Sequence, residues 1–298
     1  MRSYRAVHRD QRQVHHVIDP VRSLSEALPY VSRFAGKTVV VKIGGSTLGS
    51  GDTTLADAIM LKNLAIDVVL VHGGGSVITD WLRRIDKPAV FVDGLRVTDG
   101  ETMQVVTMAL AGLVNKELVG QIAALGGRAV GISGVDGATL RGRVKDVRLG
   151  NVGEVTDVDP ALIRTIATSG AIPVIAPIAL GADGQHLNLN ADTAAAEISV
   201  ALRAEKLLFL TDVPGIKDRD GALLSELTDQ QARKLIANGV IAGGMIPKAA
   251  ACVRALDVVA ATHIIDGRVP HSVIRELFTN MGVGTMIRRG EPQGGTSG

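Results

Sequence analysis

Aromatic residues are scarce in this chain, at 2% of its 298 residues. Its charge is almost balanced too, because 32 lysines and arginines face 30 aspartates and glutamates, which leaves a net charge of +2. Proteins dedicated to nucleic acids use rings that stack on bases or a strongly basic surface. The composition therefore argues against a nucleic-acid partner.

Cysteine and long apolar runs are lacking as well. The single cysteine, Cys252, follows three alanines, and we expect a small core residue in a reducing compartment. No uninterrupted apolar run approaches the roughly 20 residues that cross a bilayer. The first twenty residues carry four arginines and no apolar stretch, so no secretory signal is evident. We therefore expect a cytoplasmic protein without membrane contact.

Aliphatic residues are plentiful, and they occur in short runs that alternate with helical patterns. The runs are apolar at nearly every position, which predicts strands covered on both faces and hence a mainly parallel sheet. Strands that alternate with helices predict an α/β layered fold. The predicted strands cover residues 38–43, 67–72, 128–133, 172–178, 206–211 and 262–266. Stretches with Gly, Asp and Asn, at 145–158 and 180–190, predict hairpins or loops.

The two ends of the chain differ from its middle. We expect the basic leader 1–18 to be flexible and the tail 290–298 to be disordered. A helix is predicted over residues 19–36, where Pro20 suits the first helical position and Pro29 predicts a kink. Its apolar face would pack on the same chain or on another subunit.

A second helix is predicted from about Glu101 to Leu125 by apolar residues at helical spacing. Thr98 and Glu101 have the spacing of a capping box at its start. Two glycines, 126 and 127, mark its end.

Three successive glycines, Gly73 to Gly75, follow the predicted strand 67–72 and precede a helical apolar pattern. A strand that turns through glycines into a helix presents bare backbone N–H groups to an anion. The alternative is a tight turn that needs positive φ angles. His72, at the end of the strand, is interpreted as structural, with a catalytic role as the alternative.

Missing residues exclude several glycine-rich chemistries. A dinucleotide fingerprint needs a third glycine at position 78, where the chain has Ile78. The GxxxxGK[ST] phosphate loop is absent. An esterase oxyanion loop would need a GxSxG elbow, and the sequence at 131–135 lacks the final glycine. Histidine and cysteine show no metal-ligand spacing, so we expect no metal held by the protein alone.

Two lysines adjoin paired glycines at predicted element ends. Lys42 lies within the first strand and is followed by Gly44 and Gly45, and Lys248 comes after the pair 243–244. A lysine in an apolar strand needs an anionic partner, because an unpaired buried ammonium is costly. Either lysine alone is more often a surface or capping charge. The two together favour phosphoryl transfer, which depends on positioning and on cations.

Six motifs occur in the order found in the amino acid kinase family, and the chain resembles that family from Asp19 to Arg288. They are VVKIGGS (40–46), VHGGG (71–75), GLRVTD (94–99), NLNAD (188–192), LTDVPGI (210–216) and GGMIPK (243–248). Two of these motifs, GLRVTD and NLNAD with the TAAA that follows it, are similar to those of the family members that phosphorylate N-acetyl-L-glutamate for arginine biosynthesis.

The resemblance implies a three-layer αβα sandwich with a mainly parallel central sheet. It implies an acceptor lobe over residues 37–202 and a nucleotide lobe over residues 203–289. It also implies the reaction: ATP, with Mg²⁺ held by its phosphates, phosphorylates the γ-carboxylate of N-acetyl-L-glutamate. That carboxylate is ionised at neutral pH, so the site needs no general base.

Carried over position by position, the resemblance assigns roles to three groups of residues. Lys42 and Lys248 would stabilise charge on the transferred phosphoryl group, and Asp192 would hold both ammonium groups. The acceptor would contact Gly74, Gly75, Arg96, Asn188 and Asn190, with Arg96 on its α-carboxylate. The phosphates and the nucleotide would contact Gly44, Gly45, Gly74, Thr211, Asp212, Gly215, Lys217, Val240 and Ala242.

A second layer of resemblance concerns regulation. Family members that arginine inhibits end an N-terminal helix with EALPY, here at 26–30, and carry a GxGT motif, here at 282–285. This implies a homohexamer, built as a trimer of dimers through those helices. It also implies an L-arginine site at Tyr30, Glu276 and Gly284. The alternative for Glu276 is a solvated charge on a helix.

The chain departs from the family pattern in two places. Ile43 stands where many members have an aromatic residue, and SGVDG at 133–137 replaces a lysine-containing form. The nearest alternative function is a kinase for a related acceptor, carrier-linked aminoadipate or glutamate. Another is an arginine-sensing protein with a silent kinase site, which the presence of both lysines and Asp192 disfavours. A nicotinamide-dependent dehydrogenase is disfavoured by the missing third glycine.

Overall fold

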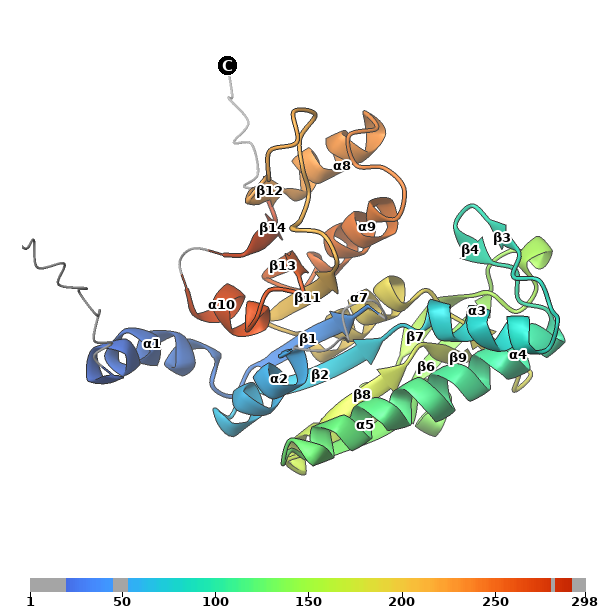
Figure 1. Ribbon diagram of the computed structural model, residues 1–298, viewed down its shortest axis with the longest axis horizontal. Coiled ribbons are helices and arrows are strands. Elements are labelled where there is room, and N and C mark those ends of the chain that lie inside the picture. Colours follow the sequence, from blue (N-terminus) through green and yellow to red (C-terminus); the bar gives the residue numbers. More distant parts are fainter. Residues whose placement is uncertain (1–19, 45–52, 280–281, 291–298) are drawn as a thin grey trace, which may run out of the picture.

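The computed structural model describes residues 20–44, 53–279 and 282–290, and Figure 1 shows their arrangement. The predicted flexible leader 1–18, the predicted phosphate contact Gly45 and most of the predicted disordered tail lie outside the described residues.

Eight strands form the central sheet. They are β1 (Thr38–Ile43), β2 (Asp67–His72), β5 (Ala129–Ser133), β8 (Ile172–Ala176), β11 (Lys206–Thr211), β12 (Glu226–Thr228), β13 (Ala261–Asp266) and β14 (Gly284–Arg288). Their order is β12-β14-β13-β11-β1-β2-β8-β5, and β13–β14 is the one antiparallel pairing among these described strands. All six predicted strands are confirmed. β8 ends at Ala176 because Pro177, which has no N–H for a ladder, follows it.

Helices cover both faces of this sheet (Figure 1). One face carries α2 (Thr54–Asn63), α5 (Asn115–Ala124) and α10 (Ser272–Phe278), and the other carries α6 (Ala161–Thr168), α7 (Ala191–Leu202), α8 (Asp229–Ala237) and α9 (Met245–Ala255). Side chains alternate between the faces along each strand. In β1, Val39 and Val41 pack with the first group and Val40 with the second. The predicted three-layer αβα sandwich is confirmed.

The predicted helix 101–125 is confirmed, but it is not uniform. It consists of α4 (Gly100–Thr107), a π-helical turn (Met108–Val114) and α5, in direct succession. A π turn inserts an extra residue into a helix, and the apolar spacing did not indicate it. By length and composition this 25-residue stretch is the one described helix that could span a membrane, yet 44% of its most apolar window is buried inside the protein.

The start of this helix corrects the prediction. Asp99, rather than Thr98, is the N-cap, because its Oδ1 accepts the N–H of Thr102 at 2.8 Å. The Thr98 hydroxyl instead donates to the Arg96 carbonyl at 2.8 Å. Glu101 turns outward, where its Oε2 lies 2.6 Å from Nζ of Lys87. The predicted capping box is therefore wrong by one position.

A smaller sheet and a hairpin lie beside the carboxyl ends of β2 and β8. The small sheet has the order β10-β9-β6-β7, with strands β6 (Leu140–Val144), β7 (Gly153–Val158), β9 (Ile178–Leu180) and β10 (His186–Asn188). The predicted hairpin at 180–190 is confirmed as β9–β10. The hairpin of β3 (Phe91–Val92) and β4 (Leu95–Arg96) follows α3 (Gly75–Arg84), and 3₁₀ turns occur at Asp136–Ala138 and Val147–Leu149.

The N-terminal helix α1 (Pro20–Phe34) extends away from the body of the protein (Figure 1). Pro29 lies within it. Its last residue, Phe34, is buried against α10, where the Phe34 and Phe278 ring centroids are 6.1 Å apart. Leu28, on the predicted apolar face, is 51% exposed. Within the described chain, α1 is therefore anchored by its end rather than along its length.

The layer of α2 provides a direct test of this packing. Leu61 is fully buried, whereas its neighbour Met60 is 47% exposed. We expect Leu61→Ala to reduce the free energy of unfolding by about 2–5 kcal/mol, through lost apolar burial and a residual cavity. The matched variant Met60→Ala should cost less than about 1 kcal/mol. Urea denaturation measures both, and equal losses would contradict the assignment of layers.

Candidate active site

Two lysines and one aspartate meet at the carboxyl edge of the central sheet. Nζ of Lys42 lies 2.8 Å from Oδ1 of Asp192, an ionic contact without hydrogen-bond alignment. Nζ of Lys248 donates to the other carboxylate oxygen, Oδ2, at 3.1 Å. Asp192 is 4% exposed and Lys42 is 7% exposed. The three predicted catalytic residues therefore form one ion cluster with an excess charge of +1, in which Asp192 and Lys42 are buried and Lys248 is half-buried.

The local sequence explains why these residues converge. Lys42 follows Val40 by two positions in β1, so its side chain lies on the same face as Val40, toward α7 and α9. Asp192 is in the first turn of α7 and Lys248 in the first turn of α9. Asn190 caps α7, because its Oδ1 accepts the N–H groups of Asp192 and Thr193 at 2.9 and 3.0 Å. This cap fixes the start of the helix that carries the shared carboxylate.

The two lysines keep Asp192 ionised. Burial by itself raises the pKa of a carboxyl group, but the positive charges of Lys42 and Lys248 outweigh it and hold the pKa of Asp192 below its ordinary 3.8. The carboxylate neutralises one ammonium charge and leaves the other uncompensated. A second anion, such as a phosphoryl group, would complete the charge balance.

The three glycines form the turn from β2 into α3, as predicted. Gly74 is the N-cap of α3, and no side chain caps this helix, so its first N–H groups are free of a capping partner within the described residues. A Cβ on Gly74 would come within 2.6 Å of Cδ2 of Leu110 and 3.3 Å of Cγ2 of Val114. A Cβ on Gly75 would meet nothing within 4 Å. Gly74 is therefore required by packing, whereas Gly75 leaves the helix start open.

A cavity of about 220 Å³ opens over this turn. Every residue predicted to contact the acceptor lines it, together with residues of the β3–β4 hairpin and the π turn. The lining residues include Gly74, Gly75, Phe91, Arg96, Leu110, Asn188 and Asn190. The cavity therefore brings together the predicted acceptor residues from three separate segments.

Arg96 supplies the positive charge of this cavity. Its Nη2 donates to the Gly75 carbonyl at 2.9 Å and to the Thr79 hydroxyl at 2.8 Å, and its guanidinium lies 4.6 Å from the ring centroid of Phe91. Its Nη1 is buried and meets no hydrogen-bond acceptor among the described residues. A buried donor without an acceptor is costly, so this atom is suited to a ligand oxygen. Arginine binds carboxylates with two parallel donors.

Asn188, another lining residue, is held by Thr98. Its Nδ2 donates to the Thr98 hydroxyl at 3.1 Å, and that hydroxyl in turn donates to the Arg96 carbonyl. Thr98 is fully buried, so the contact links β10 to the segment that carries Arg96. Phe91, Thr79 and Leu110 carry no sequence signal that marks them as site residues. Phe91 meets Arg96 only across the β3–β4 hairpin, Thr79 reaches Arg96 from α3, and Leu110 lines the cavity from the π turn.

A second cavity, of about 350 Å³, follows the carboxyl end of β11. Gly215, Lys217, Val240 and Ala242, four of the residues predicted to contact the nucleotide, line it. Thr211 and Asp212 lie at the end of β11 but are not part of this lining, and the Thr211 hydroxyl donates to Oδ1 of Asp212 at 3.3 Å.

A backbone detail explains why a glycine stands at position 215 in the lining of this second cavity. Gly215 has φ near +146°, and a Cβ there would come within 2.6 Å of the Thr285 hydroxyl. That hydroxyl accepts the N–H of Ile216 at 2.8 Å. Any side chain at position 215 would disturb this anchor.

The ion cluster lies between the two cavities in the order of the sheet. β1, which carries Lys42, is flanked by β2, whose end forms the 220 Å³ cavity, and by β11, whose end forms the 350 Å³ cavity. Ligands of open α/β sheets bind at the carboxyl ends of the strands, where strand order changes direction. Gly44, which follows β1, lies at the same edge.

Another cavity, of about 330 Å³, brings together the three residues predicted for arginine, Tyr30, Glu276 and Gly284. Glu276 is not a solvated charge: its side chain is 4% exposed. Its Oε1 accepts from Nδ1 of His263 at 2.6 Å and its Oε2 from the N–H of Val283 at 2.7 Å. Burial raises the pKa of Glu276, but the contact with His263 outweighs this effect and lowers it overall.

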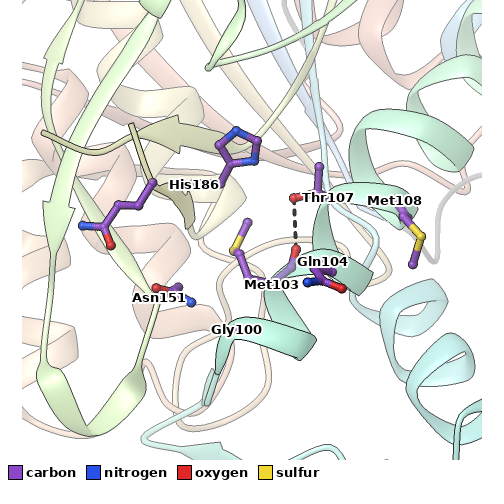
Figure 2. Close-up of a pocket in the computed structure, with 8 residues that line it drawn as sticks. Gly100, Met103, Gln104, Thr107, Met108, Asn151 and His186 are labelled. Carbon is purple, nitrogen blue, oxygen red and sulfur yellow. Dashed lines mark hydrogen bonds between the residues drawn. The ribbon is translucent and has the colours of Figure 1, made fainter. Parts of the chain in front are cut away.

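A further cavity, of about 440 Å³, lies beside α4. Figure 2 shows it between α4, with Met103, Gln104 and Thr107, and the side chains of Asn151 and His186. None of the predicted site residues lines it.

Known proteins resemble the chain over most of its length. The family described as "Amino acid kinase family" matches residues 37–266. Acetylglutamate kinase of Geotalea uraniireducens is 47% identical over 290 residues, which cover 92% of this chain and 99% of the relative. Acetylglutamate kinase of Geobacter sulfurreducens is 49% identical with the same coverage. The chain belongs to the amino acid kinase family. It is therefore a phosphotransferase.

Solved structures agree with this membership. N-acetylglutamate synthase from Neisseria gonorrhoeae, complexed with coenzyme A and N-acetyl-glutamate, superposes with a TM-score of 0.81 at 28% identity. The match covers 92% of this chain and 64% of the synthase, so the chain spans just under two thirds of that protein. Carbamate kinase from Giardia lamblia, bound to AMP-PNP, has a TM-score of 0.64 at 14% identity and shares the fold.

The ion cluster of this kinase predicts a large stability effect. We expect Asp192→Asn to cost about 3–5 kcal/mol of unfolding free energy, because the buried ammonium group of Lys42 and the half-buried one of Lys248 lose their shared counter-charge. Glu197→Gln is the matched control. It lies on the same helix and removes an exposed pair with Arg254 of α9, worth less than about 1 kcal/mol.

The effect of Asp192 should also depend on pH. Because folding lowers its pKa, the stabilisation is complete above pH 3.8 and is lost as the pH falls through the lowered value. The difference in unfolding free energy between wild type and Asp192→Asn should therefore become smaller in acid. Denaturant titrations at several pH values test this, and a difference that becomes larger in acid would contradict the ionised carboxylate.

Proposed function

We propose that this enzyme transfers the γ-phosphoryl group of ATP to the γ-carboxylate of N-acetyl-L-glutamate, in arginine biosynthesis. The observation that carries the proposal is the ion cluster with its excess positive charge between two cavities, one of which presents the unpaired Nη1 of Arg96. The acetylglutamate kinases at 47–49% identity support the choice of acceptor.

In the proposed reaction each cavity takes one substrate. The acceptor lies over the glycine turn, with its α-carboxylate on Arg96 and its polar groups near Asn188 and Asn190. The nucleotide lies along the segments 215–217 and 240–242. The acceptor γ-carboxylate then attacks the γ-phosphorus of ATP beside Lys42 and Lys248, and the bond to the β–γ bridging oxygen breaks, so that ADP leaves with its electron pair. The charges of the two lysines stabilise the negative charge spread over the transferred oxygens.

Magnesium is expected to bind mainly through the nucleotide. Among the described residues no group of three or more His, Cys, Asp or Glu side chains is arranged to hold a metal ion. Both oxygens of Asp192 are already in contact with lysine ammonium groups. The residues present therefore fit a Mg²⁺ ion carried by the ATP phosphates, where it would neutralise part of their charge.

Trapping of the acyl phosphate with hydroxylamine tests the proposed reaction. N-acetylglutamate, glutamate, aspartate and aminoadipate would each be offered with ATP. We expect product with N-acetylglutamate, because the relatives are named acetylglutamate kinases and the unpaired Nη1 of Arg96 suits a carboxylate. If product formed only with one of the other acceptors, the assignment as a kinase would stand and the assignment of N-acetylglutamate as its substrate would be wrong.

The role of Arg96 predicts a selective kinetic effect. We expect Arg96→Lys to raise the KM for N-acetylglutamate about tenfold, because an ammonium group replaces two parallel donors. The KM for ATP should change by less than about twofold. Arg83→Lys is the control, since Arg83 lies on the neighbouring helix α3 with its side chain 77% exposed. Equal changes in both KM values would contradict the assignment.

We also propose that L-arginine inhibits this enzyme at the cavity of Tyr30, Glu276 and Gly284. The cavity offers the buried Glu276 carboxylate for a guanidinium group and includes Lys206 and Arg33, which suit an α-carboxylate. The N-acetylglutamate synthase that resembles this chain is also known in complex with L-arginine, at a TM-score of 0.76 and 26% identity.

Inhibition assays with Glu276→Gln test this site. We expect the arginine concentration for half-inhibition to rise at least tenfold, because the guanidinium loses its counter-charge. Glu117→Gln, an exposed substitution on α5, should leave inhibition unchanged. Inhibition that persists in Glu276→Gln would place arginine elsewhere.

The exposed helix α1 supports a further proposal, a homohexamer of three dimers joined through N-terminal helices. Leu28 and most of the described helix are uncovered in the single chain. Light scattering tests it: we expect a hexamer for the full chain and dimers after deletion of residues 1–35. A monomeric full chain would contradict the proposal.

A further inference from the structure

A buried histidine and a buried asparagine lie directly behind the glycine turn of the acceptor cavity. His72, the last residue of β2, is 1% exposed, and Asn115, the first residue of α5, is fully buried. Nδ2 of Asn115 lies 3.2 Å from Nε2 of His72. The proposed reaction uses neither side chain, because the acceptor carboxylate needs no base.

The partners of His72 determine its protonation. Its Nδ1 lies 2.8 Å from the carbonyl oxygen of Gly73, and a carbonyl only accepts, so Nδ1 carries the proton. Burial, and to a smaller degree the charge of Lys116, lowers the pKa of His72 to about 4, against the opposing effect of the Gly73 carbonyl. The ring is therefore neutral at pH 7, and its Nε2 accepts from the amide of Asn115.

The partners of Asn115 fix its orientation in the same way. Its Oδ1 accepts from Nζ of Lys116 at 3.0 Å, and its Nδ2 donates to the Val174 carbonyl at 2.9 Å. Lysine has no acceptor and a carbonyl has no donor, so the amide has one possible orientation. Gly131 makes room for it: a Cβ at position 131 would lie 1.9 Å from Oδ1 of Asn115.

The π turn aligns these contacts with the glycine turn. Leu110 and Val114, within the π turn, are the side chains against which Gly74 packs, and Asn115 follows immediately. The same helical segment therefore contacts Gly74 through its apolar side chains and His72 through its amide. Single π turns inside α-helices are frequent at functional sites.

We propose that His72 and Asn115 are positioning residues for the acceptor, which hold the peptide between Gly73 and Gly74 in a single orientation. In a trans peptide the C=O and N–H groups point in opposite directions. Fixing the Gly73 carbonyl on His72 therefore fixes the direction of the Gly74 N–H at the cavity. Arg96 depends on the same turn, because it donates to the Gly75 carbonyl. This inference rests on the proposed function.

Two substitutions of His72 distinguish the effect of its Nδ1–H donor from the effect of the imidazole ring as a whole. His72→Leu removes the donor, whereas His72→Asn keeps an N–H at the same number of bonds from Cα. We expect His72→Leu to raise the KM for N-acetylglutamate and lower kcat, with kcat/KM falling by about tenfold or more. The KM for ATP should change by less than about twofold, because the nucleotide cavity lies beyond β1. His72→Asn should recover most of the loss.

A substitution beside Asn115 provides an independent test. Gly131→Ala places a methyl group on the Asn115 amide and should reproduce the acceptor-specific loss without altering either positioning residue. Ile122→Val is the control. Ile122 lies on α5, like Asn115, and its fully buried apolar side chain has no part in the polar contacts. Ile122→Val should lower the melting temperature with kcat/KM for the acceptor within about twofold of wild type.

Nitrogen-15 NMR measures directly which ring nitrogens of His72 carry a proton. We expect a protonated Nδ1 and an unprotonated Nε2 at pH 7 in wild type, and a mixture of tautomers in Gly131→Ala. A doubly protonated ring at pH 7 would overturn the proposal.

The kinetic outcomes are equally distinct. Suppose that His72→Leu and Gly131→Ala lower the melting temperature but leave kcat/KM for the acceptor unchanged. That result would overturn the positioning role and leave the proposed function standing. A wild-type enzyme inactive on N-acetylglutamate would overturn the proposed function, and the positioning role with it.

Discussion

The shared carboxylate of Asp192, in contact with two lysines, is the interaction on which the site depends. Two ammonium groups in a largely buried position repel each other, and one carboxylate holds both at once. The cluster keeps an excess charge of +1 in surroundings where charge is poorly screened. In the proposed reaction an arriving phosphoryl group would therefore meet a positive charge that is already in place, with no rearrangement of the protein.

The fold meets the demands of this cluster with few elements. β1 brings Lys42 to the carboxyl edge of the sheet, and α7 and α9 approach that edge with their first turns. The two cavities proposed for the substrates follow strands that neighbour β1, so a phosphoryl group between them would lie beside the lysines. The glycine turn after β2 adds a helix start without a side-chain cap on the acceptor side. In the proposed reaction the protein therefore contributes position and charge, and the acceptor contributes its own nucleophile.

Much of this arrangement could be predicted from the sequence. The apolar runs of the six strands identify the parallel sheet, because strands covered on both faces have no polar side. Gly73 to Gly75 mark the turn into α3 through their position after such a run. The meeting of Lys42, Lys248 and Asp192 has no local signal, since the three residues are far apart in the chain. Only the resemblance to a known family indicated it.

Other features could not be predicted because they arise from packing. The extra residue of the π turn leaves the apolar spacing of 101–125 almost unchanged, so the pattern indicated a uniform helix. Thr98 and Asp99 both suit a helix cap, and the choice depends on the contact of Thr98 with the Arg96 carbonyl. The burial of Glu276 depends on His263 from another element. The space that Gly131 leaves for Asn115 exists only once β5 and α5 are packed together.

A crystal structure with ADP, aluminium fluoride and N-acetylglutamate would test the central claim most directly. The planar fluoride group imitates the transferred phosphoryl group. The account predicts this group between the two cavities, with the ammonium groups of Lys42 and Lys248 both within about 3 Å of its fluorines and Asp192 still holding both lysines. A fluoride group bound away from the lysines, or an acceptor whose carboxylates contact neither the cluster nor Arg96, would contradict it.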